Sequence, residues 1–355
     1  MSEVERKVRV AVIGATGYSG QELIRLLSHH PQVELTYLAG SQEGDRDLLE
    51  TFPHLIGSPD LRIRQFRLNE CVEKSDAVFV ALPSGASGQV AADLWRQGKV
   101  VIDLSGDLRL PRDWYHEWYG KPAVADDVVG NAVYGLTEWR RAELHSATLV
   151  ANPGCYATAA LTALLPLVKY GLVQTDLPIV IDAKSGVSGA GRQASLGNQL
   201  AELGENFYAY RVGRHQHVPE IEQELNHHSK AQDGLAKILL TTQLLPMIRG
   251  IYASCYVSLQ AGVKTSEIFE AYQSLYESER FVQVLPLGKV PQLKQVRGSN
   301  QCFLGLAMDE RTGLLQVFSA LDNLQKGAAG QAVQNFNLLY HLDEQMGLTQ
   351  MPLFP

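Results

Sequence analysis

Short apolar runs alternate with helical patterns through the first part of the chain. Val8 to Ile13 is an apolar strand with one basic interruption, followed by three spaced glycines and an amphipathic helix over 21–28 that Pro31 ends. Further apolar strands are expected at 33–38, 77–82 and 100–104, with helical patterns between the later ones. Strands separated by helices form right-handed crossovers in a parallel sheet covered on both faces. The pattern therefore predicts an α/β fold with a doubly wound Rossmann sheet over residues 1–154, completed by a C-terminal helix over 323–355.

The pattern changes at Cys155. A helix-forming apolar run over 157–165 is followed by a strand at 179–183, a glycine- and serine-rich loop at 185–191, and longer strand-like stretches at 237–245, 250–259 and 314–320. This mixture predicts a second, α+β domain over 155–322 with a largely antiparallel sheet. We expect the last helix, over 327–342, to pack back on the first domain.

Composition excludes several classes of partner. The 355 residues carry a net charge of −7 and the 31 Lys and Arg residues are scattered, so we expect no nucleic-acid partner and no membrane surface. The longest apolar stretch, 157–168, contains two threonines and a proline and is too short to span a bilayer. The four cysteines lie far apart and the N-terminus has no signal-peptide pattern, which favours the cytoplasm. The histidine spacing matches no metal site, so we predict none.

The glycine loop after the first strand predicts a dinucleotide site. Its sequence, Gly14-Ala-Thr-Gly-Tyr-Ser-Gly20, reads G-x-x-G-x-x-G rather than the more common G-x-G-x-x-G. Between a strand and a helix, such glycines let the backbone approach a pyrophosphate, which the N–H groups of the helix N-terminus then bind. A merely tight strand-to-helix turn is the alternative. The predicted cofactor contacts in the loop are Gly14, Thr16, Gly17, Tyr18, Ser19 and Gly20.

The end of the second strand bears on which dinucleotide binds. NAD sites usually place an acidic residue there to bond the ribose 2′-hydroxyl, but this strand ends Leu38-Ala-Gly-Ser41. The missing carboxylate favours NADP, with Ser41 bonding and Arg46 pairing with the 2′-phosphate. Acidic residues at 43, 45 and 47 weaken that electrostatic case, so a solvated polar loop is the alternative.

Three further segments are candidate cofactor contacts. Pro83 and Ser84 belong to a turn at the carboxyl end of a strand, where doubly wound sheets place ligands. An ordinary strand-to-helix loop is the alternative there. Asn323 precedes a small-residue helix start and could approach a carboxamide, although it could equally be a helix cap. The glycine- and serine-rich loop adds Ser185 and Gly186.

Cys155 is the strongest candidate nucleophile. In Asn152-Pro-Gly-Cys-Tyr-Ala-Thr158 it follows a proline and a glycine that end any strand, and it precedes the helix-forming run. This pattern places the thiol at a helix N-terminus, whose partial positive charge lowers a thiol pKa and whose N–H groups can hold an oxyanion. The alternative is a small buried cysteine that caps a turn.

His217 is the candidate acid/base. Pro219 and the acidic residues after it indicate that a helix begins just beyond His217, which is a rigid position from which to present an imidazole. Glu220 could act there simply by favouring the helix dipole. A basic shell for a carboxylate or phosphate could be formed by Arg109, Lys184, Arg192, Arg211 and Arg214, each of which could instead be a solvated surface residue.

Taken together, these segments resemble the N-acetyl-γ-glutamyl-phosphate reductase family of arginine biosynthesis, within the semialdehyde dehydrogenase superfamily. The resemblance runs almost end to end and is carried by the glycine loop and the segments 103–109, 152–158, 184–192, 215–221 and 322–327. It implies that Cys155 is the nucleophile, that His217 is the acid/base and that NADP is the cofactor. Asn152 and His215, which lie in the matching segments, join the basic shell as expected substrate contacts.

The resemblance also implies a reaction, the NADPH-dependent reduction of N-acetyl-γ-glutamyl phosphate to N-acetylglutamate 5-semialdehyde and phosphate through a thioester on Cys155. Because the superfamily commonly forms dimers or tetramers through the sheet of the second domain, we expect a homodimer or homotetramer, with catalysis and dimerisation in 155–322. Two positions depart from the family pattern. They are Ser84, where many relatives have His, and Leu108, where Phe is common.

Three alternatives stay open. The nearest is a reductase of another acyl phosphate, aspartyl or carrier-bound aminoadipyl, because the catalytic parts would be the same. Cys155 and His217 could also serve a cysteine hydrolase or acyltransferase, although the glycine loop argues against one. The third is a non-catalytic NADP-sensing module, for which we would expect a normal thiol pKa and no acylation of the cysteine.

Overall fold

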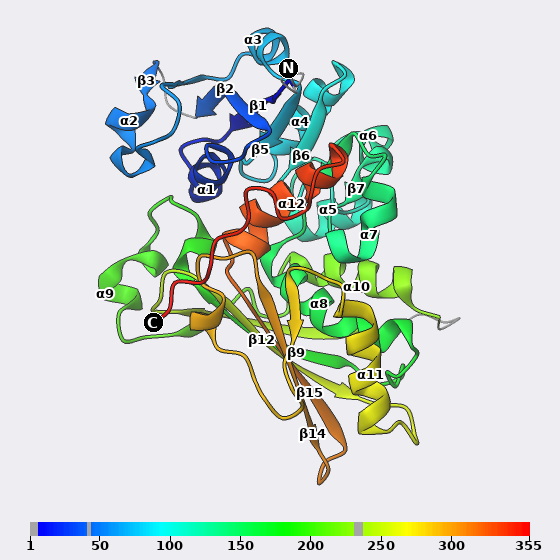
Figure 1. Ribbon diagram of the computed structural model, residues 1–355. Helices are drawn as coiled ribbons and strands as arrows, with labels where there is room; N and C mark the ends of the chain where they lie inside the picture. The colour runs from blue at the N-terminus through cyan, green and yellow to red at the C-terminus, as the bar shows by residue number, and fades with distance from the viewer. Residues whose placement is uncertain (1–5, 41–43, 231–236) are drawn as a thin grey trace, which may run out of the picture. The chain divides into compact units, whose positions relative to one another are not determined.

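The computed structural model describes residues 6–40, 44–230 and 237–355, and these form two compact units (Figure 1). Unit 1 comprises Met1–Pro153 and Ala328–Thr349, and unit 2 comprises Gly154–Gly327 and Gln350–Pro355. The last segment differs from the sequence prediction, which assigned all of 323–355 to the first domain. The tail packs on unit 2 because the Leu353 amide donates to the Arg297 carbonyl at 2.8 Å and the Leu353 side chain lies over Gly298.

Unit 1 is built on an eight-stranded sheet with the order β3-β4-β2-β1-β5-β6-β8-β7. Every pairing between these strands is parallel except that of β3 with β4. This confirms the predicted doubly wound sheet. The strands are β1 Val8–Ile13, β2 Val33–Gly40, β3 Arg46–Asp47, β4 Arg62–Gln65, β5 Ala77–Val80, β6 Val100–Asp103, β7 Val133–Tyr134 and β8 Leu149–Ala151.

Helices pack around this sheet over a core of small and β-branched side chains, such as Ala11, Val78 and Val101. Helix α1 begins at Tyr18, three residues before the predicted start, because Gly17 is extended and serves as its N-cap. The helices of unit 1 are α1 Tyr18–Leu27, α2 Leu48–Thr51, α3 Leu68–Lys74, α4 Ser87–Arg96, α5 Arg112–Tyr119, α6 Asp126–Asn131, α7 Thr137–Leu144 and α12 Gly330–Leu339.

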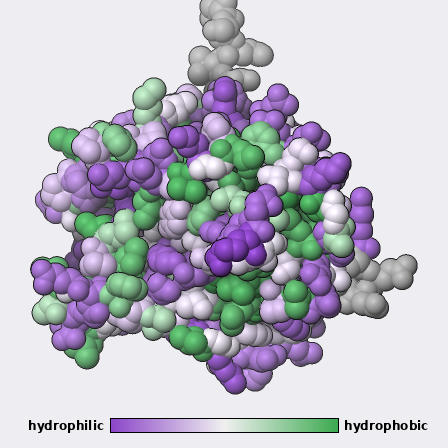
Figure 2. Space-filling model, turned by 90° about the horizontal axis from the view of Figure 1, so that it is seen from below, coloured by the Kyte–Doolittle hydropathy of each residue, from purple (hydrophilic) through white to green (hydrophobic). Residues whose placement is uncertain are grey.

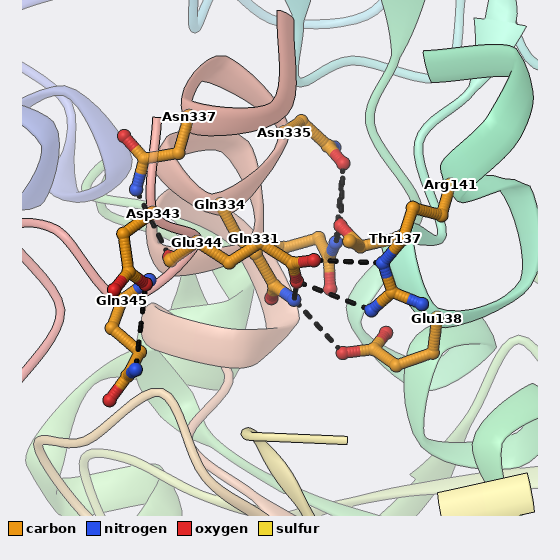
Figure 3. Close-up of polar contacts among 10 residues, drawn as sticks. All are labelled: Thr137, Glu138, Arg141, Gln331, Gln334, Asn335, Asn337, Asp343, Glu344 and Gln345. Atoms are coloured by element: carbon orange, nitrogen blue, oxygen red, sulfur yellow. Dashed lines mark hydrogen bonds and ion pairs between the residues drawn. The ribbon is translucent and has the colours of Figure 1, made fainter. Parts of the chain in front are cut away.

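Helix α12, drawn in orange in Figure 1, belongs to unit 1 and is held there by polar side chains (Figure 3). Gln331, Gln334 and Asn335 are at most 1% exposed. Gln331 Nε2 donates to the Thr137 hydroxyl at 2.6 Å, and Gln334 Nε2 donates to carboxylates on both sides, each at 3.1 Å. Buried amides are costly unless they are hydrogen-bonded, so this network favours a single position of α12 against α7.

Unit 2 contains a seven-stranded sheet with the order β10-β11-β9-β12-β15-β14-β13. The pairs β11–β9 and β14–β13 are parallel and the others are antiparallel, which confirms the predicted, largely antiparallel sheet. The predicted loop at 185–191 is wrong at its start, because Ser185 and Gly186 continue β9. The strands are β9 Ile179–Gly186, β10 Tyr208–Tyr210, β11 Ile238–Leu245, β12 Ile251–Ser258, β13 Val282–Val284, β14 Cys302–Asp309 and β15 Leu314–Leu321.

One face of this sheet is covered by helices. Helix α8 packs on β12 and β15, and α10 and α11 pack beside it. The covered face carries a cross-strand row of buried residues, Ile181, Cys255 and Val317. Within the described ranges, no helix is both long enough and apolar enough to cross a membrane. The helices of unit 2 are α8 Cys155–Lys169, α9 Leu200–Leu203, α10 His217–His228 and α11 Thr265–Tyr276.

Candidate active site

Cys155 is the first residue of α8. Gly154 before it is the N-cap in an extended conformation, and its carbonyl accepts from the Thr158 amide at 2.8 Å. The first amides of an α-helix have no carbonyl partner within that helix, so they point toward whatever faces its N-terminus. An acyl oxygen attacked by Cys155 would develop its negative charge beside them.

Accessibility separates Cys155 from the other three cysteines. Cys155 is half-buried, whereas Cys71, Cys255 and Cys302 are buried. Burial raises the pKa of Cys71 to about 11 and that of Cys255 to about 12, so both thiols stay protonated and unreactive near neutral pH. Cys155 is therefore the candidate nucleophile on accessibility as well as on its helix position.

Gly327 packs closely against Cys155. A Cβ atom built on Gly327 would lie 2.9 Å from the Cβ of Cys155 and 3.2 Å from Leu321 Cδ1. Gly327 belongs to a π-helical turn, Gln325–Ala329, and such turns often occur at functional sites. A side chain at 327 would displace the cysteine, so the space for the thiol depends on this glycine.

His217 begins α10 and packs against a second histidine. The His217 amide donates to Nδ1 of His215 at 3.2 Å, and the two ring centroids are 4.7 Å apart. Burial, helped by His217 and Arg211 nearby, lowers the pKa of His215 to about 2. His215 is therefore neutral, with Nδ1 as an acceptor and its proton on Nε2. Its predicted role as a substrate contact stays a prediction, and the structure adds its contact with His217.

Two tyrosines that the sequence reasoning missed complete this cluster. The Tyr156 ring lies edge-on to both histidines, with centroids 5.4 Å from His215 and 6.0 Å from His217. The Tyr210 hydroxyl donates to the Tyr156 hydroxyl at 3.0 Å. Burial raises the pKa of Tyr156 well above its usual range and that of Tyr210 to about 12, so both stay neutral. The position of Tyr156, directly after the cysteine, was the only signal in the sequence.

Glu220 links α10, the helix that begins at His217, to the residue before Cys155. It lies in the first turn of α10 and is 0% exposed, and its Oε1 accepts from the Gly154 amide at 2.7 Å. The sequence offered only a helix-dipole explanation for this residue. The structure adds a specific bond to the residue before Cys155.

The predicted cofactor contacts of unit 2 have partners within that unit. Asn323 accepts from the Gly250 amide at 2.7 Å and donates to the Ser188 hydroxyl at 2.9 Å. The Ser185 hydroxyl donates to the Gly186 carbonyl at 2.9 Å, and a Cβ on Gly186 would be 2.6 Å from the Ile248 carbonyl. These contacts shape the loops around the end of β9. The cofactor roles of Asn323, Ser185 and Gly186 stay predictions.

The basic residues of unit 2 are divided between two environments. Lys184 is half-buried and ion-paired with Asp182, on the face of β9 opposite to the buried Ala183. Its side chain therefore lies on the far face of the sheet from α8. Arg192, Arg211 and Arg214 are exposed. Arg211 has a left-handed backbone with φ of 50° and donates to the Gln216 side chain, which places it in the loop that leads to His217.

In unit 1, Asn152 is held on every polar atom. Its amide donates to the Asp103 carbonyl at 2.8 Å, and its own carbonyl accepts from Arg109 Nε at 2.8 Å. Its side chain donates to the Ala328 carbonyl at 3.2 Å and accepts from Asn335 at 3.1 Å. Asn152 and Arg109 were predicted to contact substrate. Those roles stay predictions, and the hydrogen bonds show that both residues also support the segment that leads to the cysteine.

The glycine loop has the backbone that its sequence predicts. Gly14 has a φ of 90°, and a Cβ there would be 2.3 Å from the Ala81 carbonyl oxygen. A Cβ on Gly20 would be 2.1 Å from the Gly14 carbonyl oxygen. The loop lies at the carboxyl end of β1, and Thr16 to Ser19 are its partly or fully exposed residues. These features fit the close approach of a pyrophosphate to backbone N–H groups.

The acidic residues near the predicted 2′-phosphate contact have partners of their own. Asp47 caps α2 and accepts two backbone amides, and Asp45 lies 3.9 Å from Arg64. Arg46 is exposed on β3. Ser41 lies outside the described residues. Of the three carboxylates that weakened the case for NADP, two are therefore engaged elsewhere.

The predicted turn at Pro83 is held by a residue that the sequence reasoning did not single out. Asp107 accepts from the Gly85 amide at 2.8 Å, from the Gly88 amide at 2.8 Å and from the Tyr115 hydroxyl at 2.7 Å. The Ser84 hydroxyl accepts from the Gly106 amide at 3.1 Å. Asp107 lies in the segment 103–109, so its motif was visible although its role was not.

A glycine-loop Rossmann unit joined to an α+β unit with a helix-terminal cysteine and a buried histidine pair defines the class of semialdehyde dehydrogenases. Two family models match the chain in this order: "Semialdehyde dehydrogenase, NAD binding domain" over 9–147 and "Semialdehyde dehydrogenase, dimerisation domain" over 155–323. Among the described residues, no group of His, Cys, Asp and Glu side chains could hold a metal ion.

Named relatives narrow the class. The chain is 48% identical to N-acetyl-γ-glutamyl-phosphate reductase of Geobacillus kaustophilus over 98% of its own length and 100% of that protein. It is 43% identical to the protein of the same name from Bacillus subtilis, with the same coverage of both chains. This chain belongs to the N-acetyl-γ-glutamyl-phosphate reductase family, a family of oxidoreductases, as the resemblance implied.

Solved structures support the fold. The chain is similar to aspartate semialdehyde dehydrogenase II of Vibrio cholerae, solved in complex with ASA, with a TM-score of 0.71 and 18% identity over 95% of this chain and 99% of that one. It is also similar to aspartate semialdehyde dehydrogenase from Candida albicans, solved with NADP, with a TM-score of 0.68 and 16% identity over 94% and 98%.

Proposed function

We propose that this chain reduces N-acetyl-γ-glutamyl phosphate to N-acetylglutamate 5-semialdehyde and phosphate, with NADPH as the reductant, in arginine biosynthesis. The observation that carries the proposal is an accessible cysteine at a helix N-terminus, followed by a tyrosine whose ring contacts a buried histidine pair, in a chain 48% identical to relatives of that name. Unit 1 would bind the dinucleotide, and unit 2 would carry the chemistry and the oligomer contact.

The first step is acyl transfer to the cysteine. The Cys155 thiolate attacks the acyl carbon, the carbon–oxygen bond to phosphate breaks, and inorganic phosphate leaves with that electron pair. The oxyanion of the tetrahedral intermediate lies beside the first amides of α8. A thioester on Cys155 remains.

The second step releases the aldehyde. The reduced nicotinamide, when bound, supplies a hydride to the thioester carbonyl. The resulting thiohemiacetal oxyanion is held by the same α8 amides, and His217 can lend that oxygen a proton and take it back as the carbonyl re-forms. When the carbon–sulfur bond breaks, Cys155 leaves as thiolate and the semialdehyde is free. His215 stays neutral throughout, so we assign the proton exchange to His217.

NADP is the proposed dinucleotide. The glycine loop has two positions at which any side chain would collide with backbone, as a pyrophosphate cradle requires. The loop after β2 offers Arg46, while Asp45 and Asp47 are occupied by Arg64 and by the N-terminus of α2. A 2′-phosphate would therefore meet less repulsion than the local count of acidic residues suggests.

Self-association is proposed through the face of the unit 2 sheet opposite to α8. That face carries half-buried apolar side chains on neighbouring strands, including Val180, Tyr256 and Phe318. Figure 2, which views the molecule from below, shows apolar side chains in patches among polar ones. The half-buried apolar side chains of the unit 2 sheet, together with the match to a dimerisation domain, support a homodimer or homotetramer. We also propose the cytoplasm as its location.

The test is phosphate-dependent NADP reduction by the purified protein in the reverse direction. N-acetylglutamate 5-semialdehyde is compared with aspartate semialdehyde, and Cys155→Ser is the control. A rate with the acetylated aldehyde alone, lost in the control, supports the proposal. A rate with aspartate semialdehyde alone would move the function to another acyl phosphate, and no rate with either aldehyde would contradict a reductase of this substrate class.

A further inference from the structure

Glu220 is a buried carboxylate with a specific partner. It lies one turn into α10 and is 0% exposed. A buried carboxylate is costly unless hydrogen bonds replace its lost hydration. Its Oε1 accepts from the Gly154 amide at 2.7 Å, across 66 residues of sequence. The bond has the length of a charge-assisted hydrogen bond, which is about twice as strong as a neutral one.

This bond fixes the residue that turns the chain into α8. Gly154 is held at both ends, because its N–H donates to Glu220 and its carbonyl accepts from the Thr158 amide at 2.8 Å. With its φ of −70° and ψ of 146°, one orientation is left for the peptide that follows. That peptide carries the amide and the Cα of Cys155, so the direction of the thiol is set there.

The same carboxylate stands on the helix of the acid/base. His217 and Glu220 are three residues apart on α10, so they lie on one face of that helix. Helix α10 therefore carries the imidazole of His217 and also the carboxylate that binds the amide of Gly154, the residue before the nucleophile. Because α8 and α10 also pack side by side in unit 2, the bond joins two neighbouring elements, one carrying Cys155 and the other His217.

We infer that Glu220 is the positioning residue of the nucleophile: through the Gly154 amide it holds Cys155 in register with His217. This inference deepens the proposed function and rests on it for the kinetic readout. The bond, rather than the negative charge, is the essential feature. A negative charge near the thiol disfavours the thiolate, so the charge alone would slow the chemistry.

Three variants separate the bond from the charge. Glu220→Gln keeps a carbonyl acceptor for the Gly154 amide and removes the charge. Glu220→Ala removes both, and Glu220→Asp withdraws the carboxylate by one methylene. Glu224→Ala is the matched control, because Glu224 is a second buried carboxylate of α10, 2% exposed, whose ion-pair partner is His228 at 4.0 Å.

The first readout is the second-order rate of Cys155 alkylation by iodoacetamide, with the modified residue located by mass spectrometry. This rate needs neither substrate nor cofactor, so it tests the inference even if the proposed function fails. The second readout is kcat and KM in the reverse reaction. Circular dichroism and thermal melting identify any variant that does not fold, in which case Glu220→Gln and Glu220→Asp carry the test.

Glu220→Ala and Glu220→Asp should lower the alkylation rate and kcat by about 10- to 100-fold, the cost of misplacing a reacting group by about 1 Å, with little change in the KM for NADP. Glu220→Gln should alkylate at the wild-type rate or faster, and the control should match wild type. Two results would overturn the inference: wild-type alkylation in folded Glu220→Ala, or a loss in Glu220→Gln as large as in Glu220→Ala.

Discussion

Gly327 faces Cys155 so closely that a methyl group in place of its hydrogen would lie 2.9 Å from the cysteine Cβ. Both residues belong to unit 2, and Leu321 closes the other side of the same space at 3.2 Å. One of the two backbones would have to move to admit the methyl group, because Cβ atoms do not approach each other so closely. The π-helical turn that contains Gly327 is therefore part of the nucleophile's surroundings.

Gly327→Ala should lower kcat by about 10- to 100-fold through displacement of the thiol, and should cost about 1–3 kcal/mol of stability through overpacking. Steady-state kinetics and urea melts measure the two effects. Gly130→Ala is the control, because a Cβ there meets nothing within 4 Å. Wild-type kcat in a folded Gly327→Ala protein would contradict the close contact.

His215 should act through its acceptor nitrogen. His215→Asn places a carbonyl oxygen near the position of Nδ1, so it can still accept from the His217 amide. We expect kcat of His215→Asn to stay within about fivefold of wild type, and His215→Ala to lose about 10- to 100-fold. Equal losses in the two variants would point instead to a direct role for the imidazole.

His215 also makes the stability of the protein depend on pH. Its pKa is lowered to about 2 in the folded chain, so in acid the unfolded chain binds a proton there that the folded chain does not. From pH 6.5 down to about 4, the free energy of unfolding should therefore fall by up to about 1.4 kcal/mol per pH unit from this group. Urea melts at several pH values measure the slope.

The comparison with His215→Asn isolates this contribution. Burial raises the pKa of Asp103 to about 6, and that shift acts in the opposite direction, stabilising the folded chain as the pH falls. Because Asp103 is present in both proteins, the difference between their slopes belongs to His215. Parallel slopes for wild type and variant would show that His215 is charged in the folded state or solvated.

Asp107→Ala should weaken dinucleotide binding more than it slows the chemistry. Asp107 holds the Gly85 and Gly88 amides, and without it the turn at Pro83 loses its anchor. Losing charged hydrogen bonds of this kind corresponds to a rise of about tenfold or more in the KM for NADP. Asp113→Ala, at an exposed position on α5, is the control. A drop in kcat with an unchanged KM would place the effect elsewhere.

Arg46→Gln should reduce the preference for NADP over NAD. If Arg46 pairs with the 2′-phosphate, the KM for NADP rises about tenfold while that for NAD changes little. Arg311, which is 84% exposed in the turn between β14 and β15, provides the control variant Arg311→Gln. A parallel rise for both dinucleotides would assign Arg46 to the fold of the loop.

Local pattern was enough for the elements that carry the chemistry. The run Val8 to Ile13 is β1 with the same bounds, and the proline, glycine and cysteine at 153–155 mark the start of α8. The strand β14 was not predicted, because Gly305 interrupts its apolar run. That glycine is required by the approach of the Lys289 carbonyl, to which a Cβ would be only 2.5 Å away.

The site was predicted least well where the partner of a residue is distant in sequence. Nothing near Glu220 indicates a bond to Gly154, and nothing near Arg109 indicates that its guanidinium donates to the Asn152 carbonyl. Basic residues were read as anion contacts because charge is visible in a sequence, whereas backbone acceptors are not. Glu220 and Asp107 were passed over as site residues for the same reason.

The placement of α12 has a consequence for the order in which the chain is made. Its residues are translated after all of Gly154–Gly327, yet they fill the core of unit 1 and anchor Asn152. The strands of the unit 1 sheet are therefore synthesised well before the helix that completes the unit. During that interval the surface that receives α12, with the side chains of Thr137 and Asn152, is uncovered, so we expect unit 1 to complete its folding only after unit 2 has been made.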